Sequence, residues 1–488
     1  MQRNFTFSPV DEIMPHMWMT VLLCFPCLDE RKQDVVECLQ KALTMMVKER
    51  PFLAGTLEKT TAEGAGRKGS LSLKLPESVD ALSGALVKVN DLTDPESGWS
   101  DSYEELRKAN FPPSKLDGSK LSPVAYGVSS ETNRVLETQA NFIKGGCILA
   151  ISTCHAFVDG WGYTLILQEW ARCCRAVQSG TPDVPGEAAA TEDDSRPPGL
   201  FVEATSEDYE NLKSRQELWG LLGLDWRRHV KTDGDAEGVQ VSQPYHDHAV
   251  ACSSLWTISP EAIAKLKVLA NQKPENGWAS SQDAVLAMLW RAITRARAPG
   301  WTAEQLQGSS MVSVAIDGRR HLTPPVPPSH VGNVVFCCLT WQPVSRLLVA
   351  PEDEENALAQ VACDVRKSIL AKGRNKPMLT DALRLAASIP DLTVDFGNAF
   401  TSWLGTDLAT SAVWDLPVYH LDFGGIFGLG DGKPEYFRFP RGQFDGLCLM
   451  HPKQVNGAVD VAITLFPEEM DRLRNDTVFT SYVKFLAE

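Results

Sequence analysis

Apolar residues in the first part of the chain pass from a strand-like run to helix-like spacing. Residues 18–25 are almost all apolar over the length of a strand. A helix is predicted to begin at Asp29 or Glu30 and to end at Pro51, followed by another extended segment. The apolar positions of this helix are Val36, Leu39, Leu43, Met46 and Val47. Residues 60–70 are rich in Gly, Ala, Lys and Glu, so they are expected to form a hairpin tip or loop.

The second half of the chain contains three helices marked by their first residues and their apolar spacing. Pro260 follows a capping serine, Ser280 or Ser281 caps the second helix, and the third is predicted to begin near Glu354. The strand-like runs are residues 311–316, 334–341 and 459–466. Because strands and helices interleave in both halves, the predicted fold class is α/β, of the mixed α+β kind with mixed sheets.

Two irregular polar stretches divide the chain. Residues 179–198 are full of Gly, Pro, Ala, Asp and Glu, as in a linker, and residues 231–248 form a second such stretch. We therefore expect an N-terminal domain at residues 1–178, a crossover region at 179–248 and a C-terminal domain at 249–488.

Composition and charge narrow the function classes. Hydrophobic residues make up 43% of the 488 residues, which is enough for a sizeable core. The net charge of −15 argues against a sequence-independent nucleic-acid binder, and no run reaches the roughly 20 apolar residues of a membrane span. The twelve cysteines lie largely in apolar runs, which favours reduced thiols in the cytoplasm. Cys24 and Cys27 have redox-motif spacing, but no second pair accompanies them.

One segment combines a strand end with chemically useful residues. An apolar run from residue 146 ends at His155, and Asp159 and Gly160 follow just before a helix pattern. A histidine can take a proton from an alcohol or amine near neutral pH. An aspartate at a helix start caps the helix or holds an arginine, and the glycine lets the backbone approach closely. The alternative without a catalytic role is that His155 is a buried core histidine and that Asp159 only caps the helix.

Three later segments give this motif a context. They are Asp317-Gly318-Arg319 with a following Gly332-Asn333, then Thr410-Ser411 with Trp414 leading to Asp422-Phe423-Gly424, and finally Gly432-Lys433-Pro434-Glu435. Together with His155 they resemble the BAHD acyltransferases in order and spacing along nearly the whole chain. Ser8-Pro9-Val10-Asp11 and Pro51-Phe52-Leu53-Ala54-Gly55 are similar to the family's opening. The longer spacing between Gly424 and Lys433 resembles the fungal branch that includes trichothecene 3-O-acetyltransferases.

The resemblance implies a fold and an activity. Two chloramphenicol-acetyltransferase-like domains are expected, joined by a long crossover, with a channel between them. The implied activity is direct transfer of an acyl group, with acetyl-CoA the leading donor, to a hydroxylated secondary metabolite such as a terpenoid, alkaloid or polyketide. Acyl-CoA and the small-molecule acceptor are the expected partners, with no permanently bound cofactor, no metal and a monomeric chain.

The resemblance also implies roles for single residues. His155 is the expected general base, and Asp159 is expected to pair with Arg319 away from the substrate. Gly160, Asp422 and Gly424 are expected to support the loops structurally, Asp422 through an ion pair. Candidate donors to the tetrahedral oxyanion are Thr410, Ser411 and Trp414. Candidates for binding CoA phosphates are Lys433, Arg438 and Arg441, although a solvated surface cluster is an equal alternative.

Other interpretations remain open. An N-acyltransferase or a condensation domain that forms amides shares the general-base logic, although such domains usually carry a second histidine where this chain has Cys154. A non-catalytic small-molecule binding protein is the alternative of another class. The second Asp-Phe-Gly, at residues 395–397, lacks the following Lys-Pro-Glu and indicates no kinase. His246 and His248 suggest no metal site without a third ligand.

Overall fold

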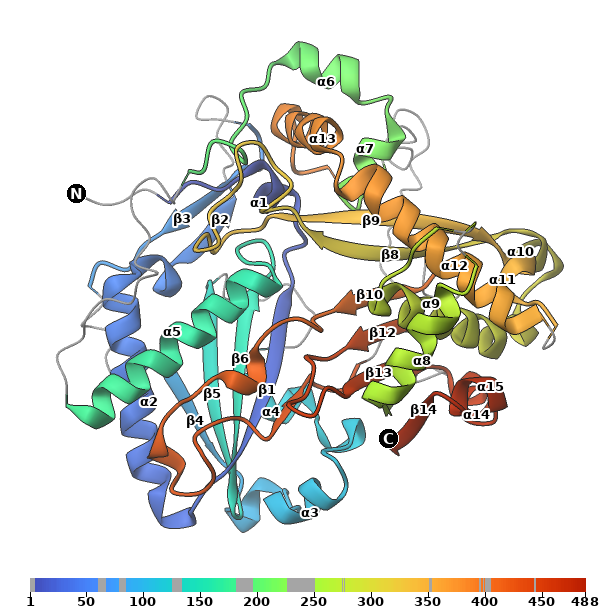
Figure 1. Ribbon diagram of the computed structural model, residues 1–488. Helices are drawn as coiled ribbons and strands as arrows, with labels where there is room; N and C mark the ends of the chain where they lie inside the picture. The colour runs from blue at the N-terminus through green and yellow to red at the C-terminus, as the bar shows by residue number, and fades with distance from the viewer. Residues whose placement is uncertain are drawn as a thin grey trace.

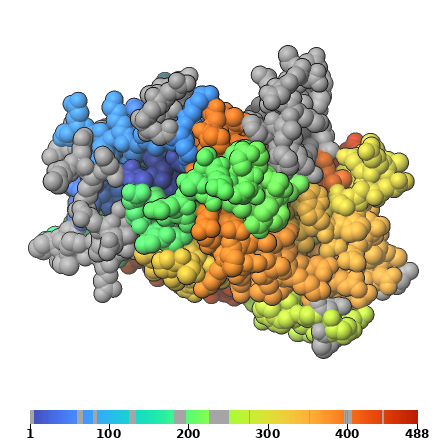
Figure 2. Space-filling model, turned by 90° about the horizontal axis from the view of Figure 1, so that it is seen from above, coloured from blue at the N-terminus to red at the C-terminus, as the bar shows by residue number. Residues whose placement is uncertain are grey.

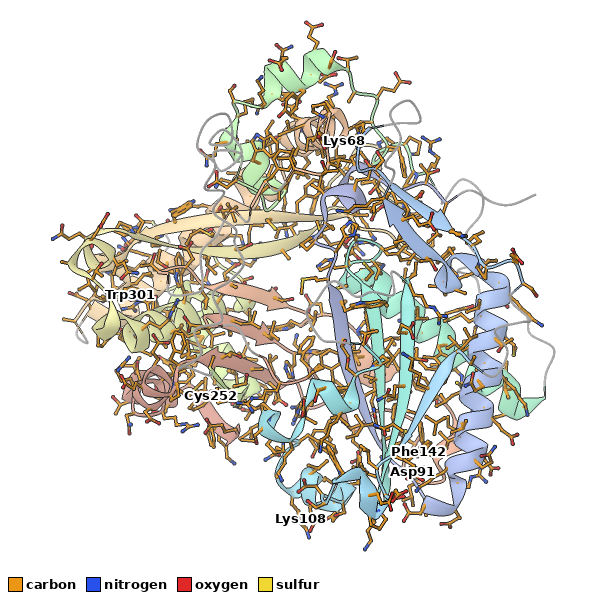
Figure 3. The ribbon with its side chains drawn as sticks, turned by 180° about the vertical axis from the view of Figure 1, so that it is seen from behind. Lys68, Asp91, Lys108, Phe142, Cys252 and Trp301 are labelled. Carbon is orange, nitrogen blue, oxygen red and sulfur yellow. The ribbon has the colours of Figure 1, made fainter. Side chains whose placement is uncertain are left out.

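Figure 1 shows the computed structural model of the chain, in which two lobes, each built on a five-stranded sheet, stand side by side. The structure describes residues 5–59, 67–78, 85–124, 134–180, 196–225, 251–273, 275, 277–350, 353–394, 396–397, 399, 405–442 and 445–488. Most of the predicted linker at 179–198, the loop at 60–70 and all of residues 231–248 lie outside the described residues. In Figure 3 the labelled Phe142 and Asp91 mark one end of the first sheet, while Cys252 and Trp301 lie in the second lobe.

The first sheet is mainly antiparallel and is centred on two long strands. Its order is β11-β1-β6-β5-β4, and only the β4–β5 pair is parallel. Strand β1 confirms the predicted strand at 18–25, and its side chains are buried on both faces, which explains why its sequence is a continuous apolar run. The strands are β1 (Trp18–Pro26), β4 (Val87–Asp91), β5 (Leu136–Ile143), β6 (Gly146–Cys154) and β11 (Tyr436–Arg438).

Two long helices cover one face of the first sheet. Helix α2 (Lys32–Glu49) confirms the helix predicted before Pro51, and α5 (Gly160–Ser179) packs against it. The indole of Trp170 in α5 donates to the Leu39 carbonyl of α2 across 3.2 Å. Helix α5 ends at Gly180, whose left-handed φ of 62° suits a glycine C-cap. The short helices α3 (Tyr103–Lys108) and α4 (Gly118–Leu121) lie on the opposite face.

The second lobe repeats the sheet-and-helix arrangement. Its sheet has the order β10-β12-β13-β7-β14, with β10 parallel to β12 and the other pairs antiparallel. The three predicted helices are confirmed as α8 (Pro260–Ala270), α9 (Ser281–Arg297) and α12 (Glu354–Ser368). The strands are β7 (Cys252–Ile258), β10 (Ala409–Ala412), β12 (Leu447–Met450), β13 (Val459–Leu465) and β14 (Val483–Ala487).

A long hairpin extends this lobe toward the first. Strands β8 (Ser309–Asp317) and β9 (Val335–Pro343) match the strands predicted at 311–316 and 334–341, and a single bridge from Val312 to Leu408 joins β8 to the segment before β10. Helix α7 (Gln216–Leu221) packs on β9, and α6 (Ser206–Leu212) lies across α13 (Lys376–Ser388), as Figure 2 shows from above. The described part of the crossover region therefore packs on the second lobe.

Chain order and packing differ in one segment. Residues 418–439 lie in sequence between β10 and β12 of the second lobe but pack in the first, where β11 pairs with β1. Phe427 stacks on Phe25 with ring centroids 4.3 Å apart, and Phe423 meets Phe25 edge-on at 5.4 Å. A segment of the C-terminal domain expected at 249–488 is therefore part of the hydrophobic core of the first lobe. Burial of its apolar side chains stabilises this arrangement.

The remaining elements are short. A 3₁₀ turn (Pro51–Ala54) leads into the small hairpin formed by β2 and β3, and α1 packs on α13. Their bounds are α1 (Pro9–Ile13), β2 (Thr56–Lys59), β3 (Leu71–Lys74), α10 (Ala303–Gln307), α11 (Val344–Leu347), α14 (Pro467–Arg474) and α15 (Thr477–Thr480). No helix in the described ranges is long and apolar enough to cross a membrane.

Candidate active site

His155 lies directly after the last residue of β6, where the sequence pattern predicts it. Its main-chain N–H donates to the Met17 carbonyl across 2.8 Å, which ties the residue to the chain just before β1. The residue is partly exposed, but Nδ1 of its ring is buried and makes no hydrogen bond to a described residue. The imidazole therefore follows the C-terminal end of β6, the central strand of the first sheet.

Asp159 caps helix α5 and also faces the second lobe. Its carboxylate accepts from the Gly162 N–H at 2.9 Å and from the Val334 N–H at 2.9 Å. Arg319 donates to both carboxylate oxygens, at 2.9 and 3.1 Å. This fork-to-fork geometry is the strongest form of the arginine–carboxylate pair. The expected Asp159–Arg319 pair is therefore present, and it crosses from one lobe to the other.

Arg319 has a second set of acceptors. Its Nη2 donates to the main-chain carbonyls of His330 and Gly332, and its Nη1 also reaches Asp317 at 3.0 Å. The guanidinium thus joins the start of α5 to the loop that precedes β9. The same loop explains why residue 162 is a glycine: a Cβ at this position would lie 1.8 Å from the Val331 carbonyl oxygen.

Asn333 connects this loop to the main chain of His155. Its Nδ2 donates to the His155 carbonyl at 2.9 Å and to Oδ1 of Asp11 at 2.9 Å. Asp11 also accepts from the Asn333 N–H and, through Oδ2, from the N–H and hydroxyl of Ser8. Burial raises the pKa of Asp11 to about 6, and these hydrogen bonds oppose the rise.

The surroundings of His155 favour its neutral form. Burial lowers the pKa of His155, because the imidazolium is poorly solvated there. The residue's own carbonyl, the charge of Asp159 and the side chain of Asn333 act in the opposite direction. A neutral imidazole at neutral pH can accept a proton from a hydroxyl or amine.

The oxyanion candidates occupy different environments. The Thr410 hydroxyl donates to the Ser313 carbonyl at 2.5 Å, so its proton is already engaged. Trp414 is buried in the second core with the Lys453 ammonium 5.2 Å from its ring centroid, which assigns it to packing. Ser411 is exposed, and its hydroxyl makes no hydrogen bond to a described residue. Beyond β10 the chain reaches Gly160, because a Cβ there would lie 3.5 Å from a Leu416 side-chain carbon.

The structure does not gather the three CoA candidates into one cluster. Lys433 is half-exposed and pairs with Asp431 at 3.0 Å within its own loop. Arg438 is buried, pairs with the buried Asp460 of β13 at 3.1 Å and donates to the Asn110 and Phe437 carbonyls. Its prediction as a phosphate ligand is therefore corrected: the guanidinium forms a buried ion pair between the two sheets. Arg441 is partly buried and makes no ion pair within the described ranges.

Comparisons with known proteins cover almost the whole chain. The model described as Trichothecene 3-O-acetyltransferase-like N-terminal domain matches residues 17–174, and that of the Transferase family matches residues 235–480. The chain is 34% identical over 494 residues to eremophilane O-acetyltransferase ORF8 of Penicillium roqueforti, with 99% of each chain covered. The chain belongs to the BAHD acyltransferase family.

Further similarities agree with this family. Eremophilane O-acetyltransferase prx11 of Penicillium rubens is 33% identical over 491 residues, which cover 99% of this chain and 98% of that protein. The solved structure of F. sporotrichioides TRI101, complexed with coenzyme A and T-2, gives a TM-score of 0.75 at 20% identity and covers 99% of this chain and 100% of that one. The mixed α/β fold with two lobes and the acyltransferase class are thus confirmed.

The BAHD Asp-Phe-Gly segment lies far from His155. Gln178, at the C-terminal end of α5, donates to the Phe423 carbonyl at 2.7 Å, whereas His155 precedes the N-terminal end of that helix. At 1.5 Å per residue, the 20 residues of α5 span roughly 30 Å. Gly424 has a φ of 74°, as expected for a tight turn.

The ion pair expected for Asp422 is absent from the described ranges. Its carboxylate instead accepts from the Gly424 N–H at 2.8 Å, and Arg175 donates to its main-chain carbonyl. The segment therefore closes its turn through main-chain groups, because the carboxylate is occupied by an N–H two residues away.

Two simpler alternatives can be compared with the described ranges. They contain no group of three His, Cys, Asp or Glu side chains placed to hold a metal, and His246 and His248 lie outside them. None of the twelve cysteines forms a disulfide, and burial raises the pKa of Cys24 to about 12 and that of Cys27 to about 11. Both thiols are therefore poor nucleophiles, which disfavours the redox interpretation.

Sequence reasoning missed the roles of two residue sets. Asp11 and Asn333 belong to segments that carry the family resemblance, but only the folded chain shows that they meet beside His155. Arg438 and Asp460 carry no local signal, because their pairing depends on β11 joining the first sheet while β13 belongs to the second.

Proposed function

We propose that this chain transfers an acetyl group from acetyl-CoA to a hydroxyl of an eremophilane-type terpenoid. The neutral imidazole of His155, held at a strand end beside the cross-lobe Asp159–Arg319 pair, carries the chemistry of the proposal. The terpenoid class is supported by two relatives, at 34% and 33% identity over nearly their full lengths, that are eremophilane O-acetyltransferases by name.

The proposed reaction proceeds without an acyl-enzyme. Nε2 of His155 takes the proton of the acceptor hydroxyl as its oxygen attacks the thioester carbonyl. The tetrahedral intermediate then breaks its C–S bond, which gives the ester and the CoA thiolate, and the imidazolium returns the proton to that thiolate. Ser411 and main-chain N–H groups are the proposed oxyanion donors, and Asp159 and Arg319 hold the loops around the base.

The substrates are proposed to meet in a channel between the lobes. His155 comes from the first lobe, while Arg319 and Asn333 come from the hairpin of the second. Of the three sequence candidates for a CoA phosphate, we retain Arg441, whose main-chain N–H donates to the Leu116 carbonyl at 2.8 Å where the lobes meet. We further infer a monomer that works in the cytoplasm, where cysteines that form no disulfide stay reduced.

Release of free coenzyme A tests the proposal. Purified protein is mixed with acetyl-CoA and a panel of eremophilane alcohols and matching amines, while free thiol and acylated products are followed. His155→Ala should abolish acceptor-dependent release, whereas His420→Ala, which removes an exposed histidine, should not. Circular dichroism checks that both variants fold. Turnover by a folded His155→Ala protein at the wild-type rate would overturn the general-base role, and products formed only from amines would replace ester formation by amide formation.

A further inference from the structure

The turn that leads into β3 of the first lobe reaches across to the second lobe. Nη1 of Arg67 donates to the carbonyls of Ala386, at 2.5 Å, and Ile389, at 3.3 Å, both at the C-terminal end of α13. A helix leaves its last carbonyls without an internal partner, and a cation beside them is favourable. The guanidinium therefore caps a helix of the second lobe from a segment of the first.

Arg67 also binds the first helix of the chain. Its Nη2 forms an ion pair with Glu12 of α1, and α1 packs on α13. The two side chains of this pair are 23% and 12% exposed. Burial lowers the pKa of Arg67 to about 10, so the side chain stays charged at neutral pH. One guanidinium thus joins α1, the turn before β3 and α13.

The two residues after Arg67 extend the contact. The Leu392 N–H donates to the Lys68 carbonyl at 2.8 Å, and the Lys68 ammonium pairs with Asp391 at 2.8 Å. Gly69 has a φ of 81°, and a Cβ there would lie 2.9 Å from the Thr393 nitrogen. Figure 3 labels Lys68 at this junction. We call residues 67–69 the clasp, because both their side chains and their main chain contact the second lobe.

The clasp is one short helix away from the candidate base. Arg67 binds Glu12, and the preceding residue, Asp11, accepts the Asn333 N–H of the second lobe at 2.8 Å. The Asn333 side chain donates in turn to the His155 carbonyl at 2.9 Å. A separation of α1 from α13 would therefore pull on the contacts that hold the main chain of the base.

We propose that the clasp is a conformational device that holds the two lobes docked around His155 when it is closed and lets them separate, each still folded, when it is open. Each lobe has its own hydrophobic core, whereas the clasp joins the lobes through polar contacts. Parts of a protein that are joined in this way open locally at a lower free energy than the cores unfold. The device concerns the assembly of the site and not the group transferred, so it goes beyond the proposed function.

Hydrogen exchange of single amides measures the opening without any substrate. The N–H groups of Leu392 and Asn333 donate across the lobe boundary, so their exchange reports undocking. Arg67→Met should speed their exchange by about 10- to 100-fold, the range expected when hydrogen bonds of a charged group are lost. The amides of β6, inside the first sheet, should exchange as in the wild type. Unchanged exchange of both reporter amides in a folded Arg67→Met protein would overturn the inference.

A matched control separates undocking from general damage. Arg172 is 21% exposed and pairs with Glu169 and Glu49, all within the first lobe. Arg172→Met should leave the two reporter amides unchanged, and equal acceleration in this variant would count against the clasp. Arg67→Lys should fall between the wild type and Arg67→Met, because lysine keeps the charge but not the fan of hydrogen bonds. It carries the test if Arg67→Met does not fold.

A disulfide across the clasp tests the device in the opposite direction. Lys68 and Asp391 are bridge partners, so Lys68→Cys with Asp391→Cys places two thiols at a separation that a disulfide spans. Oxidised glutathione takes up the two electrons as the S–S bond forms and is released as two thiols. The oxidised protein should lose the faster exchange caused by Arg67→Met, and dithiothreitol should restore it. Exchange that stays fast in the oxidised protein would contradict the inference.

Catalysis gives a readout that general stability does not move, and this arm rests on the proposed function. In Arg67→Met, coenzyme A release should be lost at a lower urea concentration than tryptophan fluorescence changes, because the lobes separate before either unfolds. In Arg172→Met the two losses should coincide. Coincident losses in Arg67→Met would also overturn the inference. If the wild type itself releases no coenzyme A with any acceptor, the proposed function fails, and the exchange measurements alone decide on the clasp.

Discussion

The Asp159–Arg319 pair should be energetically coupled across the two lobes. In Arg319→Met the Asp159 carboxylate keeps its bonds from the Gly162 and Val334 N–H groups but loses its only arginine partner in the described ranges, at an exposure of 5%. Removing one partner of a buried pair costs about 3–5 kcal/mol, because the other charge stays buried and uncompensated. The two carbonyls that Arg319 binds lose a donor as well, so the upper end of this range is expected.

A double-mutant cycle isolates the pair. Asp159→Asn should cost less than Arg319→Met, since Arg319 keeps the half-exposed Asp317 and the two carbonyls. The double variant leaves neither charge buried without its partner. Its loss in free energy of unfolding should therefore be smaller than the sum of the losses in the two single variants, by about 2–3 kcal/mol. Urea unfolding followed by tryptophan fluorescence measures each variant.

One result would refute this reasoning. If the single losses add in the double variant within about 0.5 kcal/mol, the two side chains do not stabilise one another. Arg319→Lys is the conservative comparison, because lysine keeps the charge but cannot form two parallel hydrogen bonds. We expect it to lie between the wild type and Arg319→Met.

Three further predictions follow from the same structure. Gly162→Ala should prevent folding or abolish activity, because its Cβ would lie 1.8 Å from a carbonyl oxygen, whereas Gly160→Ala should be tolerated; thermal melts and coenzyme A release check both. Arg438→Met should lower the free energy of unfolding by about 3–5 kcal/mol by stranding the buried Asp460, as urea midpoints would show. Burial lowers the pKa of His451 well below its usual value near 6.5. As the pH falls below 6.5, this histidine therefore binds a proton in the unfolded chain but not in the folded one, and the free energy of unfolding should decrease. His451→Phe should weaken this pH dependence of stability between about pH 5 and 7.

Local structure could be predicted from the sequence where a pattern within a few residues determines it. The strand at β1, the cap of α9 at Ser280 and the placement of His155 and Asp159 depend on patterns within a few residues. Arg438 shows where such reasoning stops. Its neighbours Lys433 and Arg441 suggest a basic cluster, but β11 inserts into the first sheet and buries the guanidinium against Asp460. A pairing between two sheets has no local signature.

Asp11 and Asn333 were visible as parts of the family resemblance, but their roles were not. They are 322 positions apart in sequence, and they meet because α1 packs on the second lobe while the chain continues into β1 of the first. Trp414 shows the opposite case, since its place near Thr410 suggests a site residue while its side chain fills the second core. Burial, which decides both roles, is set by the whole fold.

The main chain of the base is therefore held by contacts from two separate segments. The chain before β1 binds the His155 N–H, Asn333 of the second lobe binds its carbonyl, and Asp11 fixes Asn333. Arg319 joins the same second-lobe loop to the start of α5. A movement of one lobe against the other would stretch these contacts together, so the imidazole is expected to keep its geometry only when the lobes are docked. It follows that residues 1–178 alone would carry His155 but not the environment that orients it.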